Sequence, residues 1–392
     1  MARKRLPFRV RGIISATDDS GSDTGVTSLG ASRSSGQHFS QSRKSRTFPA
    51  RDLERMADAD IEKLFQRIRW SETDGKPACP KCQHAESWRL ENQRRWKCKG
   101  CHHQFTVTSS SILAYKQMDT REVFRAARSF AMLPKGYSAI AISHDLGCDY
   151  QTAWVLEHKF REAMLHSLQS IDRLHGTIEV DGCWVGGYIK PENTKVNRVD
   201  RRSAANQNGK RRVVVGIRER GPQGRTLVNV FDNEGQAVAW VREKCDRNAQ
   251  IYADEGVGWL NLRGTHKLDQ VNHSQRYAGD ENGKRIEINT NQMESYFSRL
   301  RRVEHGTYHR IGGTYLLRYA AETAWRENNR HLDDRAKVEL LIAACLKAPP
   351  SRSFSGYWQH HGANHVEFPQ DDVFGAFLAG LGLDDQPHPG DA

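Results

Sequence analysis

The chain has 392 residues, a formal net charge of +12 and 37% hydrophobic residues, which is enough for a core and for more than one domain. The basic excess favours nucleic acid as a partner, because neutralised phosphates release counterions. No apolar run approaches the roughly 18 residues that span a bilayer, and no signal-peptide core follows the first arginines, so we expect a soluble cytoplasmic protein with no membrane partner.

The N-terminal segment predicts a disordered basic tail over residues 1–50. Residues 12–46 are rich in Ser, Gly, Asp and Thr and have almost no large apolar side chains that would offset the entropy of ordering. The tail holds nine Lys or Arg and three Asp, so half of the net charge lies outside the expected folded body.

Apolar residues at helical spacing then predict one helix over 52–70 that packs on the module after it. They are Leu53, Met56, Ile61, Leu64, Phe65 and Ile68, followed by Trp70.

Four cysteines form the most specific motif of the chain, Cys79-Pro-Lys-Cys82 and Cys98-Lys-Gly-Cys101, with fifteen residues between the pairs. Two such knuckles at this separation present four thiolates to one tetrahedral ion, which predicts a zinc ribbon holding a structural Zn²⁺. A redox dithiol and a pair of disulfides are the alternatives. The other four cysteines are scattered singly, which suits a reducing compartment.

Three helices are predicted after the ribbon. Asp119 with Glu122 indicates the start of the first, Ser138–Asp145 covers the second, and Asp149 is a candidate cap for the third, after the turn Leu146-Gly147-Cys148. This pattern is typical of a helix-turn-helix, in which the start of the third helix enters the major groove of DNA. The residues expected near base edges are Tyr150, Gln151 and Thr152. An ordinary helical hairpin is the alternative.

From residue 176 the pattern changes to strands that alternate with helices. The predicted strands are Thr177–Asp181, Val213–Ile217, Arg225–Phe231 and Gln250–Asp254, with a crossover helix over 234–246. Gly182, Gly186 and Gly187 predict a sharp return after Asp181 into Trp184–Ile189. Ala336–Lys347 is predicted as one more helix.

Acidic residues stand at the ends of two of these strands and on one helix. Asp181 and Asp254 each end an apolar strand, and Glu294 lies on the polar face of a helix over about 290–303 together with Arg301. A meander, a helix, a strand ending in Asp and a later helix offering Glu is the layout of an RNase H-like nuclease core, where carboxylates hold two divalent cations. Glu179 shares the face of Asp181 and is a candidate for supporting the metal ligands. A solvated surface acid is the alternative for each residue.

Four motifs follow one another in this region. They are Ile178-Glu-Val-Asp-Gly-Cys-Trp-Val-Gly-Gly187, Val271-Asn-His-Ser274, Asn289-Thr-Asn-Gln-Met-Glu-Ser-Tyr-Phe-Ser-Arg-Leu-Arg301 and Gly306-Thr-Tyr-His309. Their residues, order and spacing resemble the ISXO2-like transposases of the bacterial IS1595 insertion-sequence family. The resemblance covers roughly residues 52–330, the zinc ribbon included.

The resemblance implies a DDE-type DNA transposase, which nicks transposon ends and joins the freed 3′-hydroxyl to target DNA with Mg²⁺ or Mn²⁺ as two catalytic ions. Asp181, Asp254 and Glu294 match the acidic triad that would hold these ions. Arg301 stands where family members often have Lys, and it keeps a positive charge for a phosphate. Gly182-Cys183-Trp184 departs from the family's common Glu-Thr-Tyr. Because the reaction brings two ends together, we expect at least a dimer on DNA, at the bacterial nucleoid.

Further DNA contacts are expected from basic side chains near this core. The loop from Lys190 to Arg212 is either a solvated excursion or an arm that follows DNA, and Lys210 and Arg211 are its candidate DNA contacts. His273, His305 and His309 lie in the family motifs, and a purely structural role is the alternative for each.

The chain is therefore expected to be a multidomain α+β protein in which a zinc ribbon and a helix-turn-helix precede an RNase H-like α/β catalytic core. The expected units are a tail at 1–50, a helix and ribbon at 51–112, a helix-turn-helix region at 113–170, a catalytic domain at 171–330, a helix at 331–348 and a tail at 349–392. A non-catalytic DNA-binding regulator and a nuclease or resolvase that does not transpose are the other hypotheses.

Overall fold

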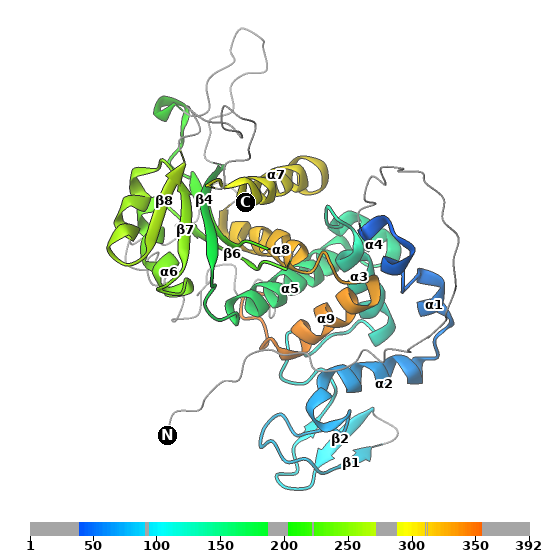
Figure 1. Ribbon diagram of the computed structural model, residues 1–392. Coiled ribbons are helices and arrows are strands. Elements are labelled where there is room, and N and C mark those ends of the chain that lie inside the picture. The colour runs from blue at the N-terminus through cyan, green and yellow to red at the C-terminus, as the bar shows by residue number, and fades with distance from the viewer. Residues whose placement is uncertain are drawn as a thin grey trace, which may run out of the picture.

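The computed structural model describes residues 39–90, 94–186, 203–221, 223–271, 288–309, 311 and 313–354. The tail before Phe39, the basic residues at 190–202, His273 and the tail after Phe354 lie outside the described residues. Figure 1 shows a sheet flanked by helices, a separate group of helices and a small β-module below it. No helix of the described ranges has the length and apolar character needed to cross a membrane.

Helices account for most of the regular structure. They are α1 Ala50–Arg55, α2 Asp58–Arg69, α3 Thr120–Met132, α4 Ala139–Leu146, α5 Tyr150–Gln169, α6 Ala237–Lys244, α7 Asn291–Val303, α8 Leu316–Asn328 and α9 Asp334–Lys347. The strands are β1 Ser87–Leu90, β2 Arg95–Cys98, β3 Gln104–Phe105, β4 Thr177–Val185, β5 Arg212–Glu219, β6 Thr226–Phe231, β7 Gln250–Asp254 and β8 Lys267–Val271.

The first helical segment differs from the prediction in two ways. Phe48 is buried against Phe124, so the folded part begins before the predicted boundary at residue 50. The single helix predicted over 52–70 is two helices, because Met56 has an extended backbone between α1 and α2. Arg121 of α3 donates to the carbonyls of Leu53 and Met56 and pairs with Asp58, so it binds the chain on both sides of the break.

The three helices after the ribbon begin where the sequence predicts. Asp119 and Glu122 form a capping box at the start of α3, and Ser138 accepts from the backbone N–H of Ala141 at the start of α4. Gly147 adopts a left-handed φ of +62° that ends α4, and Asp149 precedes α5. The C-terminal helix α9 packs against α2, α3 and α5, so it completes this helical group.

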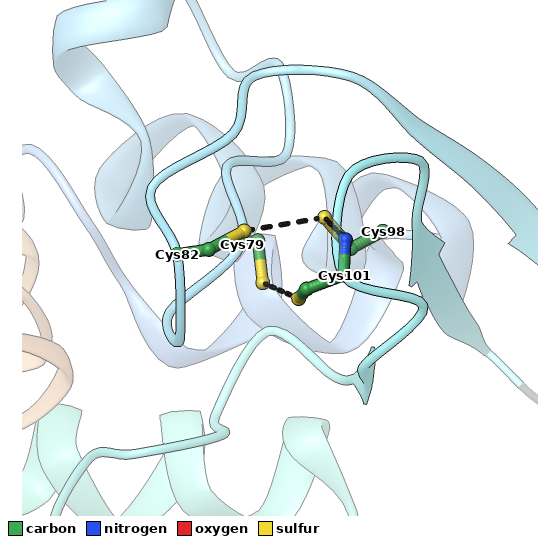
Figure 2. Close-up of side chains that lie close together, drawn as sticks. All are labelled: Cys79, Cys82, Cys98 and Cys101. Atoms are coloured by element: carbon green, nitrogen blue, oxygen red, sulfur yellow. Dashed lines mark hydrogen bonds between the residues drawn. The ribbon is translucent and has the colours of Figure 1, made fainter.

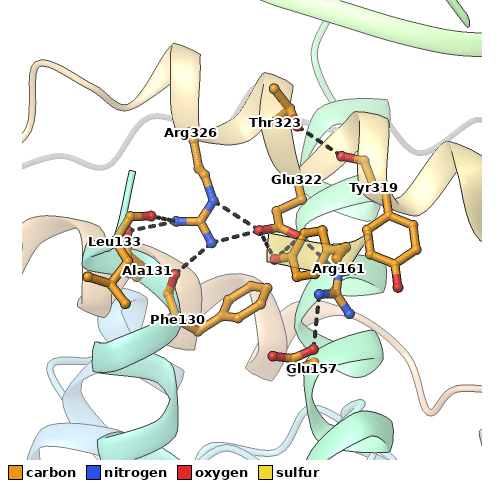
Figure 3. Close-up of polar contacts among 10 residues, drawn as sticks. Phe130, Ala131, Leu133, Glu157, Arg161, Tyr319, Glu322, Thr323 and Arg326 are labelled. Atoms are coloured by element: carbon orange, nitrogen blue, oxygen red, sulfur yellow. Dashed lines mark hydrogen bonds and ion pairs between the residues drawn. The ribbon is translucent and has the colours of Figure 1, made fainter. Parts of the chain in front are cut away.

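A buried charge network joins the helical group to α8 (Figure 3). Arg161 of α5 is fully buried and donates to Glu157 at 3.0 Å and to Glu322 of α8 at 2.8 Å. Glu322 also accepts from Arg326, whose guanidinium donates to the carbonyls of Phe130, Ala131 and Leu133 at the end of α3. A cation here satisfies the carbonyls that a helix leaves open at its C-terminus. The network therefore fixes α3, α5 and α8 to one another.

Removing the Glu322 carboxylate is expected to lower the unfolding free energy strongly, because it holds α3, α5 and α8 together. In Glu322→Ala, Arg326 loses its carboxylate and the buried Arg161 keeps only Glu157, and breaking a buried pair in this way typically costs about 3–5 kcal/mol of unfolding free energy. Glu339→Ala breaks the ion pair between Arg335, which is largely exposed, and Glu339, and should change stability by less than about 0.5 kcal/mol. Urea unfolding of both variants measures the difference. Equal effects in the two variants would contradict a structural role for the network.

The larger sheet has the strand order β6-β5-β4-β7-β8. β4, β5 and β6 are antiparallel neighbours, whereas β4, β7 and β8 are parallel. α7 and α8 pack on one face, and α6 lies on the other side of the sheet (Figure 1). Gly216 of β5 lies under Met293 of α7, where any side chain would collide with it, so the glycine lets α7 approach the sheet closely.

The sequence prediction was wrong about the end of the first strand of this sheet. β4 does not stop at Asp181 and return; it continues to Val185, and Gly182 stays extended and opposite Val215 of β5. The reason is pairing with β5, which supplies partners for the whole length of β4, while β7 pairs with β4 only as far as Val180. Asp181 is therefore in the middle of β4 but is the first residue beyond its pairing with β7.

Candidate functional site

The four cysteines of the frame converge on one point of the small β-module (Figure 2). The sulfurs of Cys79 and Cys101 are 3.7 Å apart, those of Cys82 and Cys98 are 3.5 Å apart, and all four lie within 4.8 Å of one another. Four sulfurs bound tetrahedrally to zinc at about 2.3 Å would be about 3.8 Å apart, so the thiols fit this ion. All eight cysteines of the chain are free, so the structure contains no disulfide.

The backbone and α2 hold this cluster in place. The N–H groups of Gly100 and Cys101 point to the sulfur of Cys98 at 3.3 and 3.5 Å, which favours the thiolate form that zinc requires. Trp70, at the end of α2, packs edge to face on Trp96 of β2, with 5.2 Å between the ring centres. The predicted packing of the preceding helix segment on the ribbon is confirmed.

Two carboxylates lie side by side at one end of the larger sheet. Val180 of β4 is paired with Ala253 of β7, so the next residues, Asp181 and Asp254, leave the paired parallel strands together. Burial raises the pKa of Asp181 to about 7, and the charges of Asp254, Glu294 and Glu234 act in the same direction. Asp181 accepts from the N–H of Gly182 at 2.7 Å and Asp254 from that of Gly256 at 3.1 Å. In the described part of the chain, no lysine or arginine forms an ion pair with either aspartate.

The third predicted carboxylate, Glu294, is exposed on α7, whose start is anchored to β4. Glu179 accepts from the backbone N–H groups of Gln292 and Met293 at 2.8 and 3.1 Å and pairs with Arg220 at 2.8 Å. Glu179 thus positions the helix that carries Glu294. Among the described residues, only the four cysteines bring three or more metal-ligating atoms within 4.8 Å of one another, so at least one pair among Asp181, Asp254 and Glu294 is further apart.

The candidate DNA contacts occupy two surfaces. Tyr150, Gln151 and Thr152 are exposed at the start of α5. Near the sheet, Lys210 and Arg211 lead into β5, and His309 is exposed after α7 with a left-handed φ of +56°. The Arg301 guanidinium donates to the sulfur of Cys183 at 3.2 Å, which places it beside the strand of Asp181.

Two family models match the chain. The ISXO2-like transposase domain matches residues 173–328, and the transposase zinc-ribbon domain matches residues 56–104. The chain belongs to the IS1595 transposase family. The first match contains β4 to β8 with α6, α7 and α8, and the second contains all four cysteines of the frame. Neither a curated protein nor a solved structure matches the transposase.

Two residues of this transposase were not selected from the sequence. Glu234 lies near Asp254, and burial together with the charge of Asp254 raises the pKa of its carboxyl. Trp184 is 40% exposed on β4, and the guanidinium of Arg211 lies 4.8 Å from its ring centre. A single acid before a helix gives no pattern to detect. Trp184 lies three residues after Asp181, on the opposite face of β4, so its spacing from the acid gave no signal.

The raised pKa of Asp181 predicts how the stability of the transposase depends on pH. Without metal, the folded state keeps this proton up to about pH 7, whereas the unfolded chain releases it near 3.8, so Asp181 makes stability fall as pH rises between these values. A divalent cation bound at this carboxylate would compete with the proton. Thermal unfolding should therefore show a larger stabilisation by Mn²⁺ at about pH 8 than at about pH 5.5. The pH dependence of this gain should disappear in Asp181→Asn; an equal gain at both pH values in the wild type would contradict the expectation.

Proposed function

We propose that this transposase is a DDE-type enzyme that binds the ends of an insertion sequence, cleaves the DNA there and transfers the 3′-hydroxyl end to target DNA. The observation that carries the proposal is the pair Asp181 and Asp254. They lie directly beyond the pairing of the parallel strands β4 and β7, next to α7 with Glu294, and have no cationic side chain as a partner among the described residues. Like charges gathered in a half-buried position favour a bound cation.

The order of the sheet supports an RNase H-like core. Three antiparallel strands are followed by β7, which ends in Asp254 and is parallel to β4, and by the helix with the third acid, as expected from the sequence; β8 adds a parallel strand that was not predicted. Sites in open sheets lie where the parallel strands end, and Asp254 is the last residue of β7.

Asp181, Asp254 and Glu294 would hold Mg²⁺ or Mn²⁺, which take carboxylate oxygens as ligands. When bound, such ions lower the pKa of a water or of a 3′-hydroxyl for in-line attack on a phosphodiester and stabilise the leaving oxygen. The chain itself sets the positions: pairing of β4 with β7 aligns the two aspartates, and Glu179 fixes the start of α7. Arg301, beside Cys183, would bind a DNA phosphate next to the cleaved bond.

DNA recognition is assigned to the N-terminal half. The zinc ribbon and the pair α4 and α5, acting as a helix-turn-helix, would read the transposon end, with Tyr150, Gln151 and Thr152 at base edges. Lys210, Arg211 and His309 would contact the backbone near the cleavage site. The exposed ring of Trp184, with Arg211 against it, suits stacking on a base. Joining two ends to one target requires at least a dimer on DNA.

A cleavage assay separates this proposal from its alternative, a DNA-binding regulator without catalysis. The substrate is a labelled fragment that carries one of the short inverted repeats flanking the gene. The proposal predicts binding of this fragment and a nick at the outer end of the repeat that requires Mg²⁺ or Mn²⁺. Binding without metal-dependent cleavage would favour the regulator.

A further inference from the structure

Glu234 lies at the same end of the sheet as the proposed triad but approaches from the other side. It begins a short 3-10 turn, Glu234–Gln236, that leads into α6, whereas Glu294 comes from α7 on the opposite face. Asn233 accepts from the N–H of Gln236 and so caps this turn. The Glu234 carboxylate is therefore not needed as the cap.

Three glycines leave the space that Glu234 occupies. A Cβ on Gly182 would lie 2.7 Å from Oε1 of Glu234, and a Cβ on Gly256 would lie 3.1 Å from its Oε2. A Cβ on Gly258 would meet the backbone of Gly235 at 3.1 Å. None of the three glycines has a positive φ, so their backbones could carry a side chain. A side chain at Gly182 would meet the Glu234 carboxylate and Val213, and one at Gly256 would meet Asp254, Trp259 and the Glu234 carboxylate.

The space beside Gly256 brings Glu234 together with a proposed metal ligand. A Cβ added to Gly256 would lie 3.0 Å from Oδ1 of Asp254 and 3.1 Å from Oε2 of Glu234. Both oxygens therefore lie next to the same small space beside Gly256. Gly182 is the residue after Asp181, which places the other Glu234 oxygen beside β4. Within the described residues, no hydrogen bond or ion pair holds the Glu234 carboxylate. Oδ1 of Asp254 accepts from the N–H of Gly256, but no cationic side chain of the described residues balances the two carboxylates, so a cation bound between them would stabilise both.

We propose that Glu234 is a fourth carboxylate ligand of the divalent cation site, and that Gly182 and Gly256 are glycines because they make room for it. This inference rests on the proposed function, since it concerns the site of Asp181 and Asp254. It adds a ligand that the family's triad does not contain, and it gives a physical reason for Gly182, where this chain departs from the common family sequence.

The test is Mn²⁺ binding, measured from the electron paramagnetic resonance signal of free Mn²⁺ with zinc-loaded protein and end DNA. Glu234→Gln keeps the shape and removes the charge, and should weaken Mn²⁺ binding about tenfold or more. Gly182→Ala keeps all four acidic side chains but pushes Glu234 away, and should weaken binding similarly. Glu243→Gln, at the exposed end of α6, removes one charge away from the site and should bind Mn²⁺ like the wild type.

The outcomes separate this inference from the proposed function. Asp181→Asn is measured alongside. If Asp181→Asn loses affinity while Glu234→Gln and Gly182→Ala bind like the wild type, the triad stands and the Glu234 proposal is overturned. If Asp181→Asn also binds like the wild type, the proposed metal site fails as a whole. If Glu234→Gln does not fold, Gly182→Ala decides, and unchanged affinity in that variant contradicts the proposal.

Discussion

Asp181→Asn is expected to leave end binding intact and to reduce DNA cleavage and strand transfer at least about a thousandfold, which corresponds to roughly 4 kcal/mol of transition-state stabilisation. The amide keeps the shape of the side chain but removes the charge that binds a cation. End binding should persist because the ribbon and the start of α5, which are expected to bind the end, lie apart from this end of the sheet (Figure 1).

The same loss is expected for Asp254→Asn and Glu294→Gln. Asp269→Asn is the matched control, because Asp269 is exposed on the neighbouring strand β8 and only accepts from Gln250 at 3.0 Å. Rates of nicking under single-turnover conditions measure the effect. Cleavage within a few-fold of wild type in any of the three variants would remove that residue from the proposed triad.

Cys79→Ser is expected to unfold the zinc ribbon and abolish recognition of transposon ends. The ribbon has short strands and few buried side chains, and the cluster of four cysteines lies among them. Zinc contributes about 10–16 kcal/mol to the folding of small domains of this kind, so losing one thiolate removes most of its stability. The larger sheet buries many side chains of its own, such as Val214, Ile217 and Ile251, and should remain folded.

Zinc content by atomic absorption, limited proteolysis and end binding together test this result. Cys148→Ser should keep its zinc, because Cys148 lies in the turn before α5 and not in the cluster. If Cys79→Ser lost zinc but bound transposon ends as the wild type does, the ribbon would support folding without reading DNA.

The sequence predicted those parts of the fold that depend on local chemistry. Two helix starts were predicted from the capping box at Asp119 and the cap at Ser138, because the partners of these caps lie within a few residues. The cysteine cluster was predicted from its spacing, because this spacing belongs to a known motif. β8 was not predicted, since its side chains alternate between exposed and half-buried and its apolar content is low. α8 was missed because it buries charged residues such as Arg318 and Glu322 among its apolar ones, so its apolar face is not distinct.

Long-range packing explains the other differences. The partner of Arg161 in the buried network is 161 residues away, and no spacing rule links such positions. The predicted turn after Asp181 followed from the freedom of Gly182, but this glycine stays extended in β4 opposite Val215. Glu234 itself could be found only once β4, β7 and the start of α6 were placed together.

The central claim is tested most directly by strand transfer from a transposon end that is already cut. A labelled end with a free 3′-hydroxyl is incubated with the transposase, Mg²⁺ and a supercoiled plasmid. The proposed chemistry predicts covalent joining of the label to the plasmid by the wild type and no joining by Asp181→Asn. Stable binding of the cut end without any metal-dependent joining by the wild type would contradict it.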